Sequence, residues 1–458
     1  MAVRAWLETV IPPVFGKEME DARRADISNT GIGFFILTND TNGSEYKAEM
    51  KSFFRVQTPE QLYQKLSRFK PLSSEEVPLE ESLHRVLAEN VTSSTNLPQF
   101  PRSTVDGFAL KAKDTYGVSE KNPAIFQIIG EIPMGKISEI TLKDGEAVKI
   151  ATGGMVPKSA DAVEMVEYTE WVDSRTIHAF KTLSPLENVI QAGEDIKEGE
   201  VVLRKGCLIR PQEIGLLAGI GRTDVRVFLR PKVGIISSGD EIVPIEQEPL
   251  SGEVRDINRH TIVSMVKETG GIPVFLGIAK DRFNNLKEKI EWGMRESDMV
   301  VITGGSSVGT LDLVGEVLQS FPGTEILGHG LSIRPGKPTL LAEIQGKPFL
   351  GLPGHPVSAM VIFHLFGKSI LKILSGLSDE KGPRLRLRAR AGRNIPSVAG
   401  KEDYVRVKLE EKDGILWACP VFGKSGAISH LINADGLLKI GINDEGLEEG
   451  EEAEVIFI

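Results

Sequence analysis

A glycine-rich loop follows a β-branched run in the stretch VVITGGSSVGTLDL, residues 300–313. Five of its residues could receive an anion, because glycine allows close approach of the backbone and serine can donate hydrogen bonds: Gly304, Gly305, Gly309, Ser306 and Ser307. A helix that begins just after the glycines would add to this preference. The loop matches neither the Walker P-loop nor the dinucleotide-binding pattern GxGxxG. By itself it fits a phosphate cradle and an ordinary strand turn equally well.

Four carboxylates occur in loops that should meet at one sheet edge: Asp240, Glu241, Asp281 and Asp312. Ligands of open parallel sheets bind beyond the carboxyl ends of the strands. Carboxylates gathered there repel one another unless a cation is present, and carboxylate with phosphate oxygens is a usual setting for Mg²⁺. Asp240, Glu241 and Asp312 are therefore candidate metal ligands. Each could instead be a helix cap or a solvated surface group.

Two further motifs supply cations and a rigid turn. Arg334 and Lys337, in the stretch SIRPGKP, could hold oxyanions. Pro353 and Pro356, in GLPGHPVSA, predict a rigid wall beside them. His355 stands alone in that turn, where a structural role is the simpler interpretation.

Strands and helices alternate from residue 229 to 378, and they must position these loops. Buried β-branched strands separated by helices indicate a doubly wound parallel sheet with helices on both faces. The overall fold class is therefore α/β and multidomain.

The rest of the chain divides into smaller units. We expect a poorly ordered extension (residues 1–53) and an elongated helical linker domain in two pieces (54–97 and 197–228). We also expect an inserted β domain (98–196) and a C-terminal β domain (379–458). Within the linker domain, helices are predicted over residues 58–69, where Thr58 can act as the N-cap, over 78–91, and over 211–221.

Composition limits the function classes. The formal net charge of −10 over 458 residues argues against a nucleic-acid or membrane-surface binder. Cys207 and Cys419 are the only cysteines, which suits a reducing compartment. No apolar run in the sequence suggests a membrane span. A cytoplasmic protein without nucleic-acid or membrane partners is expected.

Seven motifs, in order, resemble those of the molybdopterin molybdenumtransferase family, which is related to the E domain of gephyrin. SSGDEI, TGGSSVGTLD and GLPGHPVSA resemble the family's molybdopterin-binding fold. PQFPRSTVDGFA, ATGGMVPKSADAVEMVE and QAGEDI resemble its upstream motifs, and FGKSGAISHLINADGLLKI its final domain. The resemblance extends from about residue 54 to the C-terminus.

The resemblance implies insertion of molybdate into adenylylated molybdopterin, with Mg²⁺ and with release of AMP. It implies a homodimer whose site combines motifs of two domains. By motif, it assigns function to Asp106, Thr152, Asp195, Glu241, Asp281, Asp312, Lys337, Pro353 and Pro356. Ser306, His355 and Gly330 depart from the family's usual residues, and Arg334 keeps a charge where the family often has lysine.

Three alternatives stay open at this stage. A gephyrin-like scaffold would use the same fold to bind a partner peptide. Another nucleotide-processing enzyme could share the α/β domain, although the upstream motifs speak against it. Tungstate is a tetrahedral dianion like molybdate, so the sequence does not distinguish a tungstate-specific transferase.

Overall fold

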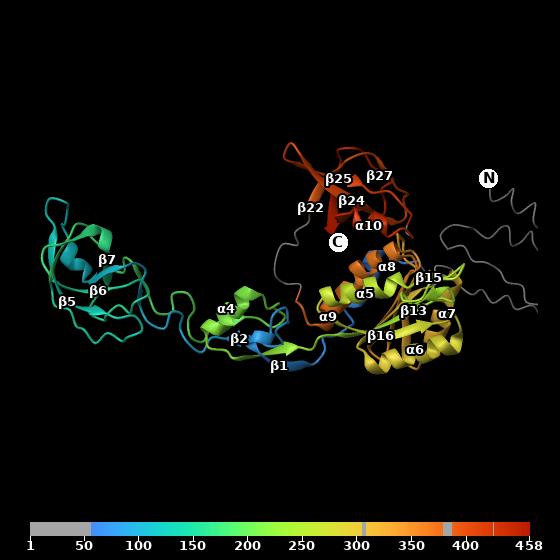
Figure 1. Ribbon diagram of the computed structural model, residues 1–458, viewed down its shortest axis with the longest axis horizontal. Helices are drawn as coiled ribbons and strands as arrows, with labels where there is room; N and C mark the ends of the chain where they lie inside the picture. The colour runs from blue at the N-terminus through green and yellow to red at the C-terminus, as the bar shows by residue number, and fades with distance from the viewer. Residues whose placement is uncertain (1–55, 305–307, 379–386, 425) are drawn as a thin grey trace, which may run out of the picture.

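The computed structural model describes residues 56–304, 308–378, 387–424 and 426–458. The predicted extension 1–53 and three of the predicted loop residues, Gly305, Ser306 and Ser307, lie outside the described part. The molecule is elongated, with a β body at one end, an α/β body at the other and a narrow linker between them (Figure 1). A second β body, formed by the C-terminal residues, lies against the α/β body (Figure 1).

The α/β body is built on a six-stranded sheet. Its spatial order is β16 (Ile272–Ala279), β13 (Lys232–Ser238), β17 (Met299–Gly304), β21 (Lys347–Leu352), β20 (Leu340–Ile344) and β18 (Thr324–His329). The first four strands are parallel, which confirms the prediction for this part of the sheet. The last two strands are antiparallel to their neighbours, so the prediction of a parallel sheet was wrong for this part. The cause is local: Gln345 and Gly346 both have positive φ, a two-residue turn that closes a hairpin.

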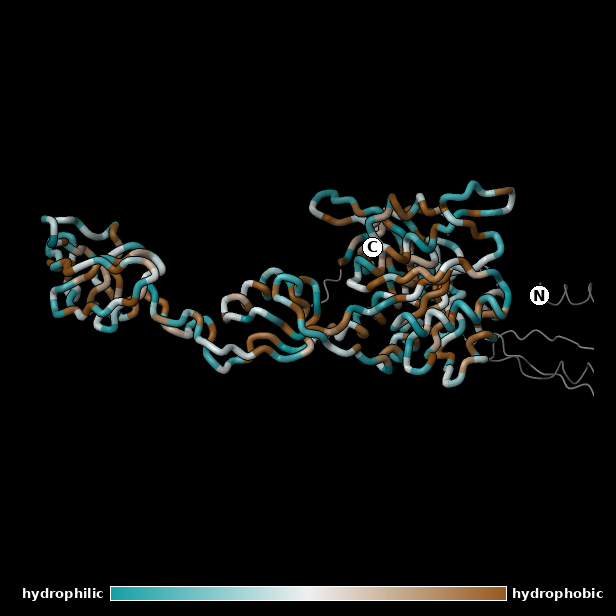
Figure 2. The backbone as a smooth tube through the Cα atoms, turned by 60° about the horizontal axis from the view of Figure 1, so that its bottom comes forward, coloured by the Kyte–Doolittle hydropathy of each residue, from teal (hydrophilic) through white to brown (hydrophobic). Residues whose placement is uncertain are grey.

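Helices cover both faces of this sheet, as predicted. On one face lie α5 (Ile257–Glu268), α8 (Pro356–Ile362) and α9 (Lys368–Leu374), and on the other α6 (Phe283–Glu296) and α7 (Val308–Gln319). Strand side chains alternate between the two cores: Ile235 packs in the first and Ile236 in the second. Hydrophobic residues concentrate inside this body, and hydrophilic ones lie on its outer loops (Figure 2).

One helical stretch in the described part is long and apolar enough to cross a membrane, residues 356–374, although no such run was expected. Of its most apolar window, 67% is buried inside the protein. Phe363 and Phe366 from this stretch are fully buried in the α/β core. The stretch is therefore accounted for as the core helix of the body.

The linker is less helical than predicted. It pairs β1 (Ser74–Pro78) with β12 (Asp224–Phe228) and β2 (Val91–Thr92) with β11 (Val201–Leu203), and α4 (Pro211–Gly219) confirms one predicted helix. The helix predicted over 78–91 was wrong: only a 3-10 turn forms at Leu79–Glu81. His84 has a φ of 61°, outside the right-handed helical region, and Leu87 forms a β-bridge with Val227.

The first helix, α3 (Pro59–Leu66), confirms the predicted N-cap. The Thr58 hydroxyl accepts a hydrogen bond from the Gln61 backbone N–H at 3.2 Å, and the Thr58 backbone N–H donates to the Gln61 side-chain oxygen at 3.0 Å. Its apolar face, with Leu62 and Leu66, joins the α/β core. This helix packs on the α/β body, whereas the sequence had placed it in the linker domain.

The two β bodies have separate sheets. The inserted body orders β7 (Ala162–Met165), β4 (Gly107–Leu110), β6 (Glu146–Ile150), β5 (Ala124–Ile132), β9 (Thr176–Ala179) and β8 (Thr169–Trp171). The C-terminal body orders β19 (Ile333–Arg334), β24 (Glu402–Lys412), β25 (Ile415–Pro420), β22 (Leu387–Ala391), β28 (Glu452–Phe457) and β26 (Gly436–Ile440). Strand β19 comes from the α/β part of the chain and pairs with β24. This pairing ties the C-terminal body to the α/β body.

Candidate active site

Two adjoining cavities lie at the carboxyl end of the α/β sheet. The larger, of about 620 Å³, lies between the α/β body and the C-terminal body. The smaller, of about 240 Å³, lies over the ends of β13 and β17. Gly354 and His355 line both. One extended ligand could therefore occupy both cavities past the proline–glycine turn.

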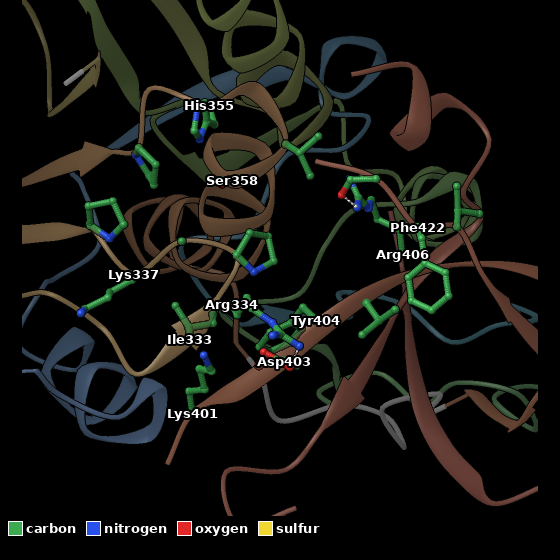
Figure 3. Close-up of a pocket in the computed structure, with 18 of the residues that line it drawn as sticks. Ile333, Arg334, Lys337, His355, Ser358, Lys401, Asp403, Tyr404, Arg406 and Phe422 are labelled. Atoms are coloured by element: carbon green, nitrogen blue, oxygen red, sulfur yellow. Dashed lines mark hydrogen bonds and ion pairs between the residues drawn. The ribbon is translucent and has the colours of Figure 1, made fainter. Parts of the chain in front are cut away.

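The larger cavity is rich in cations. Arg334, Lys337, Lys401 and Arg406 line it, with Asp403 as its carboxylate (Figure 3). Two of the four cations, Arg334 and Lys337, were predicted, and so was Pro353 in the wall. Lys337 and Lys401 make no ion pair with any described residue. Such a lining suits an oxyanion.

Arg334 is partly committed to a structural contact. It forms an ion pair with Asp403, whose side chain is 1% exposed (Figure 3). Asp403 also accepts a hydrogen bond of 2.5 Å from the Ser397 hydroxyl. The charge of the carboxylate is thus compensated at Oδ2, which reduces its repulsion toward an anion in the cavity, while the buried Oδ1 has no hydrogen-bond partner among the described residues.

Arg406 was not predicted, and its side chain is half-buried. Its Nη2 donates to the carbonyl of Gly423 at 2.6 Å, while its buried Nη1 has no hydrogen-bond partner among the described residues. Burial lowers the pKa of Arg406 from its ordinary value. A desolvated guanidinium N–H without a partner is costly, and an oxyanion in the cavity would supply one. In the sequence, Arg406 looks like any charged residue of the strand DYVRVKL.

The smaller cavity combines oxygen-bearing side chains with apolar residues and glycines, and Arg255 and His355 line it as well. Four of its buried oxygens have no hydrogen-bond partner in the described part of the chain: Ser237 Oγ, Thr303 Oγ1, Asp256 Oδ2 and Asn258 Oδ1. Predicted residues Glu241, Gly304 and Pro356 also line it. Gly304 has a φ of 147°, and a Cβ there would lie 2.0 Å from the Ser238 carbonyl, so only glycine fits.

Other predicted acids lie outside both linings. Asp312 Oδ1 is 3.6 Å from His329 Nε2, and burial raises the pKa of Asp312 while lowering that of His329. Asp240 is exposed, and its carbonyl accepts from Lys280 Nζ at 2.8 Å. Asp281 follows β16. Within the described ranges, no three His, Cys, Asp or Glu side chains gather closely enough to hold a metal, so the predicted three-ligand set is not brought together.

The upstream residues lie elsewhere in the chain. Asp106 Oδ1 accepts from the Thr152 backbone at 2.7 Å and from its hydroxyl at 3.1 Å, and these bonds lower the pKa of Asp106. Both belong to the inserted β body, at the opposite end of the molecule from the cavities (Figure 1). Asp195 is exposed in a loop, where its backbone N–H donates to Leu97 at 3.1 Å. One chain therefore does not bring these residues to the cavities.

Family comparisons agree with this architecture. The α/β body belongs to the molybdopterin-binding class, because residues 234–373 match the family described as "Probable molybdopterin binding domain". Residues 56–221 match the MoeA N-terminal region, domains I and II, and residues 388–458 match the MoeA C-terminal region, domain IV. The chain belongs to the MoeA family.

Individual relatives cover most of the chain. A molybdopterin biosynthesis protein of Methanocaldococcus jannaschii is 35% identical over 421 residues, covering 89% of this chain and 99% of the relative. The molybdopterin molybdenumtransferase of Bacillus subtilis is 32% identical over 390 residues, covering 84% and 90%. The crystal structure of a MoeA protein from Pyrococcus horikoshii superposes with a TM-score of 0.77 at 31% identity, covering 88% of this chain and 100% of that one.

Proposed function

We propose that this chain is a molybdopterin molybdenumtransferase, which inserts molybdate into adenylylated molybdopterin and releases AMP. The observation that carries the proposal is the cationic larger cavity beside the acceptor-rich smaller one. The first suits a dianion such as molybdate, and the second suits a neutral ring with N–H donors. A scaffold that only binds a peptide has no need of four cations around a cavity, so the enzyme is the better account.

Each cation has a distinct part in this proposal. Arg406 offers a buried, unpartnered N–H to the oxyanion, and the exposed Lys337 and the half-buried Lys401 add charge at the same cavity. Arg334 keeps Asp403 compensated. A bare carboxylate about 4 Å from a unit negative charge would cost about 4 kcal/mol at an effective dielectric of 20. Molybdate and tungstate fit this lining equally.

The proposal includes a magnesium ion that the protein and the substrate phosphates would bind together. Mg²⁺ commonly takes one or two carboxylates and completes its shell with water and substrate phosphates. Glu241 lines the smaller cavity together with the oxygen-bearing side chains of Ser237, Asp256 and Thr303, and these oxygens fit such an ion, although Arg255 and His355 line the cavity as well. When bound, Mg²⁺ would neutralise charge on the phosphates as AMP leaves.

A homodimer would complete the site. Since Asp106 and Thr152 lie at the far end of the same chain, a two-fold partner could place its inserted body over these cavities. A cytoplasmic location and the expected lack of nucleic-acid and membrane partners stay predictions.

The direct test incubates the full chain with adenylylated molybdopterin, Mg²⁺ and either molybdate or tungstate, and follows AMP by chromatography. AMP release that depends on the oxyanion is expected. Release that is the same without oxyanion, or no release at all, would refute the transferase.

A further inference from the structure

The four unpartnered oxygens belong to side chains that line the smaller cavity. Asp256 is 3% exposed and Asn258 9%, and each side chain is held by one bond that leaves its other oxygen without a partner among the described residues. Asp256 Oδ1 caps α5 by accepting from the Arg259 backbone at 3.0 Å, which leaves Oδ2. Asn258 Nδ2 donates to the Gly354 carbonyl at 2.8 Å, which leaves Oδ1. Both remaining atoms are acceptors in fixed positions.

These acceptors need a ligand with N–H donors. A buried acceptor without a partner costs about 1–3 kcal/mol, and more when it is charged, so four in one cavity indicate a polar occupant. The unpartnered atoms are a carboxylate and an amide oxygen, which only accept, and two hydroxyls, Ser237 and Thr303, which can also donate. Glu241 adds a second carboxylate to the lining, and Arg255 and His355 add nitrogen donors. An anion directly beside Asp256 would be repelled by its carboxylate, so a phosphate is disfavoured there unless a cation such as the proposed Mg²⁺ lies between them.

We propose that Asp256 and Asn258 read the amino-pyrimidinone edge of the pterin, and that Asp256 is a specificity-determining residue for the 2-amino group. The inference rests on the proposed function, which supplies the pterin. That edge presents adjacent N–H donors, from the ring nitrogen and the 2-amino group. At about 240 Å³ the smaller cavity is below the roughly 300–1,000 Å³ of sites for drug-sized ligands, so it holds part of the substrate.

The proposal divides the substrate between the cavities. The ring lies in the acceptor-rich cavity, and the molybdate-binding portion faces the cationic cavity beyond Gly354 and His355. A site built to pair with a ligand N–H rejects an analogue that lacks it, because its own buried groups are then left unpaired. Selectivity for pterin over lumazine, the pteridine with oxygen in place of the 2-amino group, should follow.

The test measures binding of free pterin and free lumazine to the full chain by fluorescence, with Mg²⁺ and again with a chelator. The wild-type chain should prefer pterin by about tenfold or more. Asp256→Asn keeps a good N-cap residue but turns an acceptor toward the ligand into a donor, so the preference should vanish or invert. Asp256→Ser, also a good cap but shorter, should lose the preference too.

A matched control is Asp435→Asn. Asp435 Oδ2 accepts from the Leu409 backbone at 2.8 Å and lines neither cavity, so its variant should keep the wild-type preference. The proposal is overturned if Asp256→Asn keeps that preference, or if the wild-type chain shows none or binds neither compound at millimolar concentration. If the Asp256 variants lose affinity equally for pterin and lumazine, and this loss disappears in chelator, Asp256 is a metal ligand. That outcome would also overturn the proposal.

The AMP-release assay separates this inference from the proposed function. If the wild-type chain releases AMP but Asp256→Asn retains pterin selectivity, the transferase stands and the inference falls. If the chain releases no AMP yet shows the selectivity and loses it in Asp256→Asn, the reading of the pterin edge stands without the transferase.

Discussion

Arg334 and Asp403 form an ion pair across the boundary between the α/β body and the C-terminal body, and the carboxylate is 1% exposed. Arg334 belongs to β19 and Asp403 to the paired strand β24, so the contact adds to a backbone connection. The pair holds together the walls of the larger cavity. Arg334 therefore has a structural role, whereas the sequence had suggested that Arg334 and Lys337 both hold an oxyanion.

Removing Arg334 should therefore act on stability. Arg334→Ala leaves a buried carboxylate with only Ser397 as a side-chain donor, and we expect a loss of about 2 kcal/mol in the free energy of unfolding, measured with urea. The exposed Arg388, 3.7 Å from Glu452, is the control: Arg388→Ala should cost about 1 kcal/mol or less. Equal small losses in both variants would show that the Arg334 pair is not structural.

Removing the side chain of Lys337 or of Arg406 should weaken binding of the oxyanion. Lys337→Ala should leave the melting temperature unchanged and raise the molybdate concentration for half-maximal AMP release, because the side chain is exposed and has no ion pair among the described residues. Arg406→Ala should raise it further, by roughly tenfold or more, since a desolvated guanidinium N–H is lost. A fall in maximal rate with an unchanged molybdate requirement would argue against an oxyanion role for these cations.

Glu241 and Asp312 should respond differently to magnesium. Glu241→Ala should lower the maximal rate of AMP release and recover in part with excess Mg²⁺, because Glu241 lines the smaller cavity. Asp312→Ala should lower activity without such recovery, because Asp312 faces His329 outside both linings. Rescue of both variants by Mg²⁺ would place Asp312 at the metal after all.

Complementation tests the composite site. Asp106→Ala and Glu241→Ala alter opposite ends of the molecule, and each homodimer should be nearly inactive. After unfolding and refolding together, half of the dimers are mixed and each mixed dimer has one intact site, so about a quarter of wild-type activity should return. No recovery, or a monomer by light scattering, would contradict the dimer.

Glu164 should make the inserted body sensitive to pH. Its side chain is fully buried, neither oxygen has a partner among the described residues, and burial raises its pKa to about 7. The folded state then holds a proton that the unfolded state loses near pH 4.5, so stability should fall as pH rises from about 4.5 to 7. Glu164→Gln should remove this slope and gain on the order of 2 kcal/mol at pH 8, measured by urea unfolding between pH 5 and 8. An unchanged slope would show that Glu164 is not the titrating group.

Particular elements show how far the sequence could predict this protein. The alternation of apolar strands and helices indicated the α/β body, and Thr58 correctly predicted a helix start. The run 78–91 has a helix-like apolar spacing, but its apolar side chains pack on strands that come much later in the chain, β11 (Val201–Leu203) and β12 (Asp224–Phe228). Such packing overrides a local pattern.

The site was predicted in part for the same reason. Loops at the carboxyl ends of strands are predictable, so Glu241, Gly304, Pro353 and Pro356 were found. Arg406 and Asp256 were missed, because one looks like a surface charge and the other like an ordinary helix cap. Their importance comes from the atoms left without partners after folding, which depend on the neighbours that the tertiary structure supplies.

The antiparallel pairing of β2 with β11 has an architectural consequence. Val91 and Thr92 lie directly opposite residues 201–203, so the chain leaves the linker and returns to it at nearly the same place. The inserted body is thus an insertion of about 110 residues whose two ends lie side by side on the pair of strands β2 and β11. The insertion could be shortened, exchanged or replaced by a simple turn that joins β2 to β11, and the path of the rest of the chain would stay the same.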